Sequence, residues 1–314
     1  MGVFVYLPLV LPLTALPIAR LAEQHLHPRS AARLLATLAV ILASCSTLCL
    51  GLLVVVGTAQ LPGNPLPDGW SDDEVRDAVP QDRIAGETAV AALTAVAVAC
   101  ASAVWRHYRF RSRAHRALAA LSTTAEVAVL PDHVPYAYAL PGSPGRIMVS
   151  SAMLGCLTEA EQGALLAHER AHLAGRHHRL LLAVQLAGCA NPLLRPLRSA
   201  ITYSTERWAD EEAAADTGDR RLTAQAVGKA AIISHRAATG TVAAFAAAGP
   251  VPRRVAALLG PLPPERGWPP VLTPTGVAAF VAAAGTALST LSSLNAVFAL
   301  FVAVEAAATP LQES

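Results

Sequence analysis

HERAHLAGRHHR, residues 168–179, is the stretch from which the rest of the chain can be interpreted. His168 and His172 stand four residues apart in an alanine-rich run, so on an α-helix both imidazoles lie on one face. Glu169 lies about 100° around the helix from His168, within reach of a water held between the histidines. This spacing is typical of a zinc site with a general base. The same short pattern also arises by chance, so the prediction depends on the flanking sequence.

The flanking sequence predicts a rigid helix around the motif. Thr158 followed by Glu161 is a capping-box pair, which marks the start of a helix just before GALLAHERAHLAG. Leucines at 180, 181 and 182 indicate that this helix runs on past Gly175. A further apolar stretch, residues 179–197, is interrupted at Asn191-Pro192 and is too short to span a membrane, so we expect a buried or membrane-skimming helix.

A catalytic zinc usually has three protein ligands and a water, so a third ligand must lie downstream. His178 is one candidate, because the string from His168 through Gly175 to His178 fits the metzincin pattern. That pattern also needs a methionine turn after the motif, and all three methionines of the chain precede it. A helix that continues past Gly175 would also carry His178 away from the metal.

Glu206 is the candidate that we favour. It lies in STERWADEEAA, residues 204–214, where Asp210 stands four residues further on the same helix face. A glutamate completes a two-histidine shell, and an aspartate one turn away can accept the other ring N–H of a ligating histidine. The competing interpretation of this stretch is an acidic, solvated helix face.

These motifs resemble those of membrane-embedded gluzincin metallopeptidases, a group that includes HtpX, the CAAX prenyl proteases and the β-lactam sensor-transducers. The resemblance covers about residues 126–260. It implies one zinc ion per chain, with His168, His172 and Glu206 as ligands. It also implies that Glu169 is the catalytic base and that Asp210 supports a ligand.

The resemblance extends to two further segments. Similar proteins carry an arginine in a segment like PRRVAALLG, residues 252–260, where Arg254 matches better than Arg253. This cation would bind the oxyanion of the reaction or hold the Glu206 helix in place. GRIMVSSAML, residues 145–154, matches a strand that binds substrate backbone at a sheet edge, so we expect Ile147–Ser150 to be an edge strand, although it could also only complete the sheet.

Composition places the chain in a lipid bilayer. Of 314 residues, 54% are hydrophobic and only 15% are charged, which is too apolar for an ordinary soluble domain. Apolar runs at about 3–19, 34–57, 88–105 and 276–303 predict about four transmembrane helices. The expected architecture is mostly α. A membrane region at 1–105 precedes an α+β metallopeptidase domain at 106–275, and a last helix and tail occupy 276–314.

Arginine placement predicts the orientation. Five arginines and no acid lie between residues 106 and 116, whereas the loop from 58 to 87 is rich in aspartate and glutamate. By the positive-inside rule, the domain at 106–275 is cytoplasmic in a multi-pass cell-membrane protein. Beside a spanning helix such a basic stretch contacts anionic lipid headgroups, so no direct nucleic-acid partner is expected.

The predicted function is a zinc-dependent endopeptidase acting on protein or peptide substrates at the cytoplasmic face. The resemblance offers two roles, cleavage of a transcriptional repressor in signalling and quality control of membrane proteins. With only a short tail after the last apolar run, we expect no extracellular sensor domain. A non-catalytic membrane regulator is the alternative, against which the complete motif with Glu169 argues. A transporter is disfavoured because the clear spanning runs contain no ionisable residue.

Overall fold

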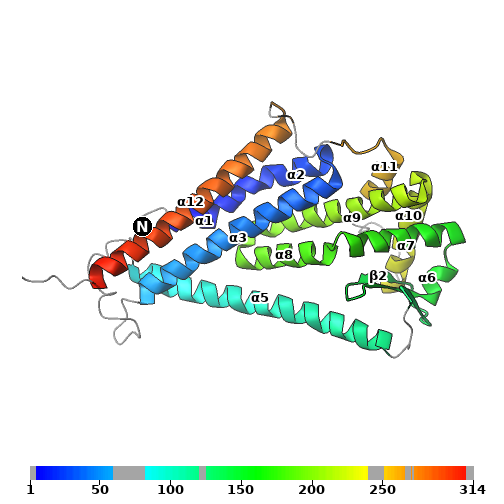
Figure 1. Ribbon diagram of the computed structural model, residues 1–314, viewed down its shortest axis with the longest axis horizontal. Coiled ribbons are helices and arrows are strands. Elements are labelled where there is room, and N and C mark those ends of the chain that lie inside the picture. Colours follow the sequence, from blue (N-terminus) through cyan, green and yellow to red (C-terminus); the bar gives the residue numbers. More distant parts are fainter. Residues whose placement is uncertain are drawn as a thin grey trace, which may run out of the picture.

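The computed structural model describes residues 5–58, 82–119, 125–239, 251–265, 270 and 272–308, and it is mostly helical. Its elements in chain order are α1 (Leu7–Val10), η2 (Leu11–Ala15), α2 (Leu16–His25), α3 (Pro28–Thr58), α5 (Asp82–Ala119), β1 (Val127–Leu130), β2 (Ala137–Leu140), β3 (Arg146–Ser150), α6 (Ser151–Gly155), α7 (Glu159–Ala174), α8 (His177–Ala190), η4 (Pro192–Leu194), α9 (Arg195–Thr217), α10 (Arg220–Thr239), α11 (Val251–Leu259) and α12 (Pro274–Ala308). The long helices α3, α5 and α12 come together at one end of the molecule, the small sheet lies at the other, and α5 runs along most of the length between them (Figure 1).

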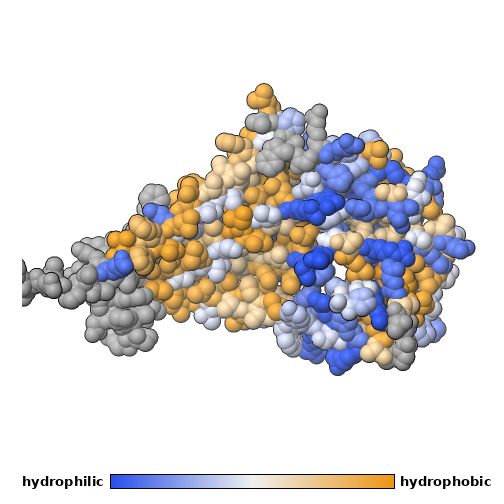
Figure 2. Space-filling model, in the orientation of Figure 1, coloured by the Kyte–Doolittle hydropathy of each residue, from blue (hydrophilic) through white to orange (hydrophobic). Residues whose placement is uncertain are grey.

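Three helices among the described residues are long and apolar enough to cross a membrane, namely Pro28–Val55, Gly86–Ala119 and Pro274–Val302. They cover the second, third and fourth apolar runs of the sequence to within two residues. The surface over this end of the molecule is hydrophobic, whereas the end that carries the sheet and α7 is largely hydrophilic (Figure 2). This division is the one expected of a bundle in lipid that presents a polar domain to water.

The first apolar run, residues 3–19, does not form one continuous helix in its described part. It is divided into α1, η2 and the start of α2, with prolines at 8, 12 and 17. Proline lacks the backbone N–H that an α-helix requires, so a helix with this sequence is interrupted. Residues 3–19 are therefore absent from the three candidate spans.

A buried polar cluster satisfies the carbonyl groups that this break exposes. Pro12 has no N–H to donate to the Pro8 carbonyl, and the Ser46 hydroxyl of α3 donates to that carbonyl at 2.7 Å instead. The Asn191 side-chain amide donates to the Leu9 carbonyl at 3.0 Å and to the Ser46 hydroxyl at 2.9 Å. Broken helices are tolerated at membrane depth when neighbouring side chains satisfy the backbone in this way. The cluster therefore joins three segments that are far apart in the sequence.

Asn191 also ends α8, as the Asn-Pro interruption predicts. Its side-chain oxygen accepts a hydrogen bond from the Leu193 N–H at 3.0 Å, and Pro192 begins the short helix η4 that leads into α9. The helix α8 lies between α3 and α5 without crossing the full length of the bundle (Figure 1). The structure thus has the interruption and the short helix predicted in residues 179–197, but α8 is mostly half-buried, with only His177, Val184, Ala187 and Gly188 buried.

The sheet corrects one prediction. Its strand order is β1-β3-β2, with β1 parallel and β2 antiparallel to β3. The strand Ile147–Ser150 therefore lies within β3 at the centre of the sheet, and the prediction that it is an edge strand is wrong. Its alternation and turn signals predict a strand, but they do not state how many neighbours pair with it. The free edge beside α7 belongs to β2 instead.

The helix α5 extends beyond the apolar run that predicted it. It continues through Trp105 and the arginine-rich segment as far as Ala119. Ala114 and Leu118, in its last turns, pack with the buried sheet residues Ala128 and Met148. The boundary predicted between residues 105 and 106 thus falls inside one continuous helix that joins the apolar end of the molecule to the sheet.

The Asn191 cluster generates a test of this packing. Replacing Asn191 by leucine removes the amide donor and leaves the Leu9 carbonyl and the Leu193 N–H without side-chain partners. We expect the free energy of unfolding to fall by about 1–3 kcal/mol, the usual cost of unsatisfied buried groups. Thermal unfolding of the detergent-solubilised protein measures this. Ser199→Ala is the matched control, because the exposed Ser199 hydroxyl bonds only to the Pro196 carbonyl. An equal effect of both variants would contradict the role of the cluster.

Candidate metal centre

The helix α7 begins at the predicted capping box. The Thr158 hydroxyl accepts from the Glu161 N–H at 3.3 Å, and the Thr158 N–H donates to the Glu161 carboxylate at 2.8 Å. The Lys229 ammonium lies 2.8 Å from the same carboxylate and ties α10 to this end of α7. These contacts fix the start of the helix that carries His168, Glu169 and His172.

The helix α7 ends earlier than the leucine run predicts. It stops at Ala174, and Arg176 takes a left-handed conformation with φ 50° before α8 begins at His177. The prediction that one helix continues through the leucines at 180–182 is therefore wrong. Gly175 permits the sharp turn, since a side-chain carbon there would clash with the His177 ring. The turn brings His177 back onto His172, with the two Nδ1 atoms 2.9 Å apart.

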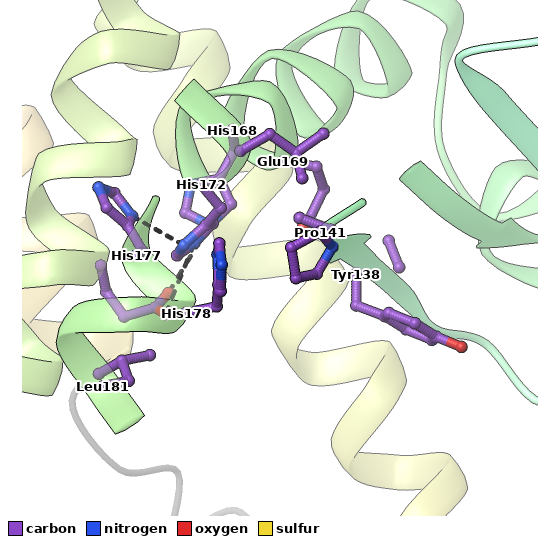
Figure 3. A pocket seen from close by; sticks show the side chains of 12 residues that line it. Tyr138, Pro141, His168, Glu169, His172, His177, His178 and Leu181 are labelled. Carbon is purple, nitrogen blue, oxygen red and sulfur yellow. Dashed lines mark hydrogen bonds and ion pairs between the residues drawn. The ribbon is translucent and has the colours of Figure 1, made fainter. Parts of the chain in front are cut away.

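The side chains of His168, His172 and Glu206 converge on one point. The two Nε2 atoms are 3.1 Å apart, and each lies 3.6 Å from a carboxylate oxygen of Glu206. Three ligands bound tetrahedrally at 2.0–2.1 Å are separated by about 3.3 Å, so these distances suit one zinc ion. Figure 3 shows His172 between His168 and His177 in the pocket that α7, α8 and α9 surround. The structure thus brings together the three residues predicted as ligands.

The charges around the two histidines favour a cation between them. Burial opposes protonation of His168, yet the carboxylates of Asp210 and Glu206 raise its pKa to about 10. Burial together with the neighbouring His168 lowers the pKa of His172 to about 4. At neutral pH these pKa values leave His168 protonated and His172 neutral. The two facing Nε2 atoms therefore share one positive charge beside the carboxylates. A divalent metal would supply that charge and accept both lone pairs.

Asp210 lies behind His168, as the sequence predicts. Its Oδ1 atom is 3.1 Å from Nδ1 of His168, on the side of the ring opposite the Glu206 carboxylate. Such a carboxylate holds a ligating imidazole in the tautomer that presents Nε2 to the metal. Burial raises the pKa of Asp210, but hydrogen bonds from Arg254 and His168 outweigh it and keep the carboxyl ionised.

Arg254 binds both acidic residues of α9. Its Nε and Nη2 atoms donate to the two oxygens of Asp210 at 2.8 and 2.6 Å, and its Nη1 atom lies 2.9 Å from Glu206. The side chain is buried, and its pKa is raised by these carboxylates against the effect of burial. Of the two roles considered for this arginine, the contacts support holding the Glu206 helix in place. Arg253 instead pairs with Glu23 at the surface, 2.8 Å away.

The helix α11 that carries Arg254 is itself anchored at its end. Arg220 of α10 donates to the Leu258 and Ala257 carbonyls, each at 3.0 Å, and also pairs with Glu211 of α9. A cation that binds the last carbonyls of a helix stabilises its C-terminus. Sequence reasoning missed Arg220, because nothing in residues 220–221 distinguishes it from a surface arginine.

Glu169 lies in the same pocket, a cavity of about 360 Å³ lined by α7, α8, α9 and β2. Burial raises the pKa of its carboxyl, while the backbone N–H of Ala139 in β2 hydrogen-bonds it. A carboxyl with a raised pKa can accept and return a proton near neutral pH. Glu169 is thus close to the cluster without belonging to it.

The other candidate ligand, His178, lines the pocket but is not among the residues whose donor atoms converge. Although the helix breaks near Gly175 as the metzincin pattern requires, the turn directs His177 to the cluster, where it contacts His172 through Nδ1. The His177 ring is buried against Trp208, with ring centroids 4.4 Å apart. Sequence reasoning assigned His177 no specific contact, although its position five residues after His172 is visible in the motif.

Two adjacent arginines provide a matched test of the site. Arg254→Ala removes the guanidinium from the fully buried Asp210 carboxylate and leaves it only the contact with His168, so we expect a loss of about 3–5 kcal/mol in the free energy of unfolding. Zinc affinity should fall by about 10- to 100-fold, as when a group that supports a metal ligand is lost. Arg253→Ala removes the pair between the exposed Arg253 and Glu23 and a contact with the Tyr203 ring, and it should change stability by about 0–2 kcal/mol.

Zinc competition and thermal unfolding of the two purified variants check this expectation. Arg254→Lys retains the charge but loses the two-pronged contact with Asp210, so it should fall between wild type and Arg254→Ala. Equal zinc affinity in Arg254→Ala and Arg253→Ala would contradict the positioning role.

Comparison with known protein families agrees with this geometry. Residues 101–191 match the model of peptidase family M48, a stretch that runs from within α5 to the end of α8. It includes His168, Glu169 and His172, whereas Glu206, Asp210 and Arg254 lie beyond it. Comparison with curated proteins finds no match, and neither does comparison with solved structures. Over this segment the chain is therefore similar to M48 peptidases, and the segment carries the two histidines of the histidine–glutamate cluster.

Proposed function

We propose that the protein is a membrane-embedded zinc endopeptidase. The observation that carries this proposal is the convergence of His168, His172 and Glu206 on one point, with the Glu169 carboxyl in the same pocket. A structural metal site has no use for an adjacent buried carboxyl, whereas peptide hydrolysis requires one to move a proton.

Each residue of the site has a separate role in the proposed hydrolysis. A zinc ion held by the three ligands would supply a Lewis acid that acidifies water and polarises a peptide carbonyl. Glu169 takes the proton from the attacking water and delivers it to the departing amine. Burial supports this exchange, because it raises the pKa of the carboxyl toward the working range of a general base. Arg254 and Asp210 hold Glu206 and His168 in position during the reaction.

The substrate is proposed to lie along the free edge of β2. In this antiparallel pair, Ser150 donates its N–H to the Tyr136 carbonyl, so residues 136, 138 and 140 face β3 and residues 137 and 139 face away. Ala137 and Ala139 line the pocket with Glu169. An extended peptide added to this edge would pass over the metal site, held by backbone hydrogen bonds that read little of its sequence.

The site is proposed to face the cytoplasm, on the basis of the arginine-rich end of α5. Its place at the polar end of the molecule supports access by water-soluble segments of proteins as well as by segments next to a membrane (Figure 2). The substrates of both proposed roles, a transcriptional repressor and misfolded membrane proteins, would have such segments. Both remain proposed roles of the same reaction.

The chemistry is tested by separating metal binding from catalysis. Glu169→Gln should keep zinc but lose cleavage of an unfolded test protein by at least about 100-fold, since general-base catalysis contributes roughly 10²–10⁴-fold. His168→Ala, His172→Ala and Glu206→Ala should each lose zinc. The matched control is His178→Ala, which should retain it. Zinc analysis and a protease assay are the measurements. Undiminished activity in Glu169→Gln would favour a non-catalytic role for this residue, and loss of zinc in His178→Ala would restore the metzincin assignment.

The substrate path is tested on β2. Ala137→Pro removes the N–H that faces the pocket while leaving the bonds from residues 136 and 138 to β3, so turnover should fall about tenfold or more with zinc retained. Ala137→Val keeps the N–H and serves as the control. Val149→Pro should instead destabilise the sheet, because Val149 lies in the central strand. Wild-type turnover in a folded Ala137→Pro protein would place the substrate elsewhere.

A further inference from the structure

We propose that the seam between α5 and α8 binds one anionic phospholipid, with its phosphate in a basic pocket and an acyl chain in an apolar groove below it. Two separate cavities carry this inference, and they lie along the same two helices. Neither is required by the proposed peptidase chemistry.

The basic pocket has a volume of about 720 Å³ and lies where the arginine-rich half of α5 passes the start of α8. Five of its lining side chains are arginine or histidine, and none is acidic: His107, Arg111, Arg176, His178 and Arg179. Within the described parts of the chain, the guanidinium groups of Arg176 and Arg179 have no hydrogen-bond or ion-pair partner. A cavity with several cations and no counter-charge attracts an anion.

The pocket has further features that suit a phosphate. Burial, and to a smaller extent the nearby Arg111 and Arg179, lower the pKa of His178 to about 4. The pocket also lies at the N-terminal end of α8, where backbone N–H groups and the helix dipole favour negative charge. Arg176 lies in the turn between α7 and α8, where its backbone is left-handed. Planar guanidinium groups bind phosphate oxygens well.

The apolar groove has a volume of about 790 Å³ and is lined by α3, α5 and α8. Its lining is almost wholly aliphatic and includes Leu48, Leu93 and Leu186. On α8, the basic pocket is lined by Arg179 and Leu182, and the groove by Ala183, Leu186 and Ala190. Arg179 lies four residues before Ala183, Leu182 four before Leu186, and Leu186 four before Ala190, so these positions form one stripe along the helix.

The same continuity holds on α5. Leu93 and Cys100 line the groove, and His107 and Arg111 line the basic pocket, at spacings of seven, seven and four residues on one helix face. The two helices run side by side here, with the Cys100 thiol 3.8 Å from the Leu186 carbonyl (Figure 1). A single seam thus presents a charged cavity at one end and a hydrocarbon-lined groove next to it, as a phospholipid requires.

The position of the basic pocket along α5 also matches the depth of the lipid phosphates in a bilayer. From Gly86 to Trp105, α5 covers about 30 Å, the thickness of the hydrocarbon core. His107 and Arg111 follow at about 3 and 9 Å beyond Trp105. The headgroup layer on each side is roughly 5–8 Å thick, so these side chains reach lipid phosphates. Pro141, Leu173 and His178 line both this pocket and the metal-site cavity, so a bound headgroup would lie at the edge of the active site.

Lipid retention by the full-length protein tests the proposal. The protein in mild detergent is mixed with equal amounts of phosphatidylglycerol and phosphatidylcholine of matched chain length, and retained lipid is measured by native mass spectrometry. We expect one retained phosphatidylglycerol. The Arg176→Gln/Arg179→Gln double variant should retain it about 30-fold less well, at roughly fivefold for each arginine near a membrane surface. The matched control is Arg106→Gln/Arg113→Gln, which removes two charges from the same basic region outside the pocket and should retain the lipid.

The groove is tested at Gly51. A side-chain carbon added there meets no atom within 4 Å, so Gly51→Leu fills the groove without a backbone clash, whereas Gly51→Ala barely enters it. Gly51→Leu should lower phosphatidylglycerol retention several-fold, and Gly51→Ala should not. Unchanged zinc content in every variant shows that the fold is intact and separates this test from the peptidase proposal.

Three results would overturn the proposal. One is equal retention of phosphatidylglycerol by the wild type and the Arg176/Arg179 variant. Another is equal phosphatidylglycerol retention by Gly51→Leu and the wild type, combined with full displacement of the lipid by glycerol phosphate. This result would indicate an anion site without an acyl groove. The third is loss of the retained phosphatidylglycerol when an acidic peptide is added and binds in its place, which would assign the basic pocket to the substrate.

Discussion

The ion pairs of Arg254 with Asp210 and Glu206 are the interaction on which the site depends. Two carboxylates four residues apart on a buried helix face repel each other and are costly to bury unless a cation lies between them. Arg254 supplies that cation from α11, and Asp210 in turn orients His168. The metal centre is therefore assembled from helices α7, α9 and α11, which lie far apart in the sequence. The anchoring of α11 by Arg220 contributes to it by holding the helix that carries Arg254.

A second constraint comes from the membrane. Lipid offers no hydrogen bonds to an interrupted helix, so the prolines of the first apolar run require partners from elsewhere in the chain. Ser46 and Asn191 provide them, and Asn191 also turns the chain from α8 into α9. Because α9 carries Glu206 and Asp210, the packing at membrane depth and the position of the third ligand are linked through one helix. The proposed lipid on the α5–α8 seam would act on the same scaffold from its outer face.

Local chemistry accounts for what could be predicted without the structure. The spacing of His168, Glu169 and His172 and of Glu206 and Asp210 follows from helix periodicity, and the Thr158–Glu161 capping box is a property of four residues. Hydropathy likewise predicts the helices that the structure has at Pro28–Thr58, Asp82–Ala119 and Pro274–Ala308. Each of these signals depends on neighbours within a few turns, so sequence alone is sufficient.

The tertiary structure decided what depends on distant partners. The pairing of β3 on both sides, which makes β2 the free edge, requires contacts between strands that the alternation of residues 145–154 cannot specify. The end of α7 at Ala174 reflects a close approach of Gly175 to the His177 ring rather than any helix-breaking signal in the leucine run. The partners of Arg254 and the alignment of a basic pocket with an apolar groove arise only when helices separated by many residues pack together. In sequence, the motif and the candidate membrane helices are determined by periodicity and hydropathy, whereas the free edge of β2 and the seam between α5 and α8 exist only through packing.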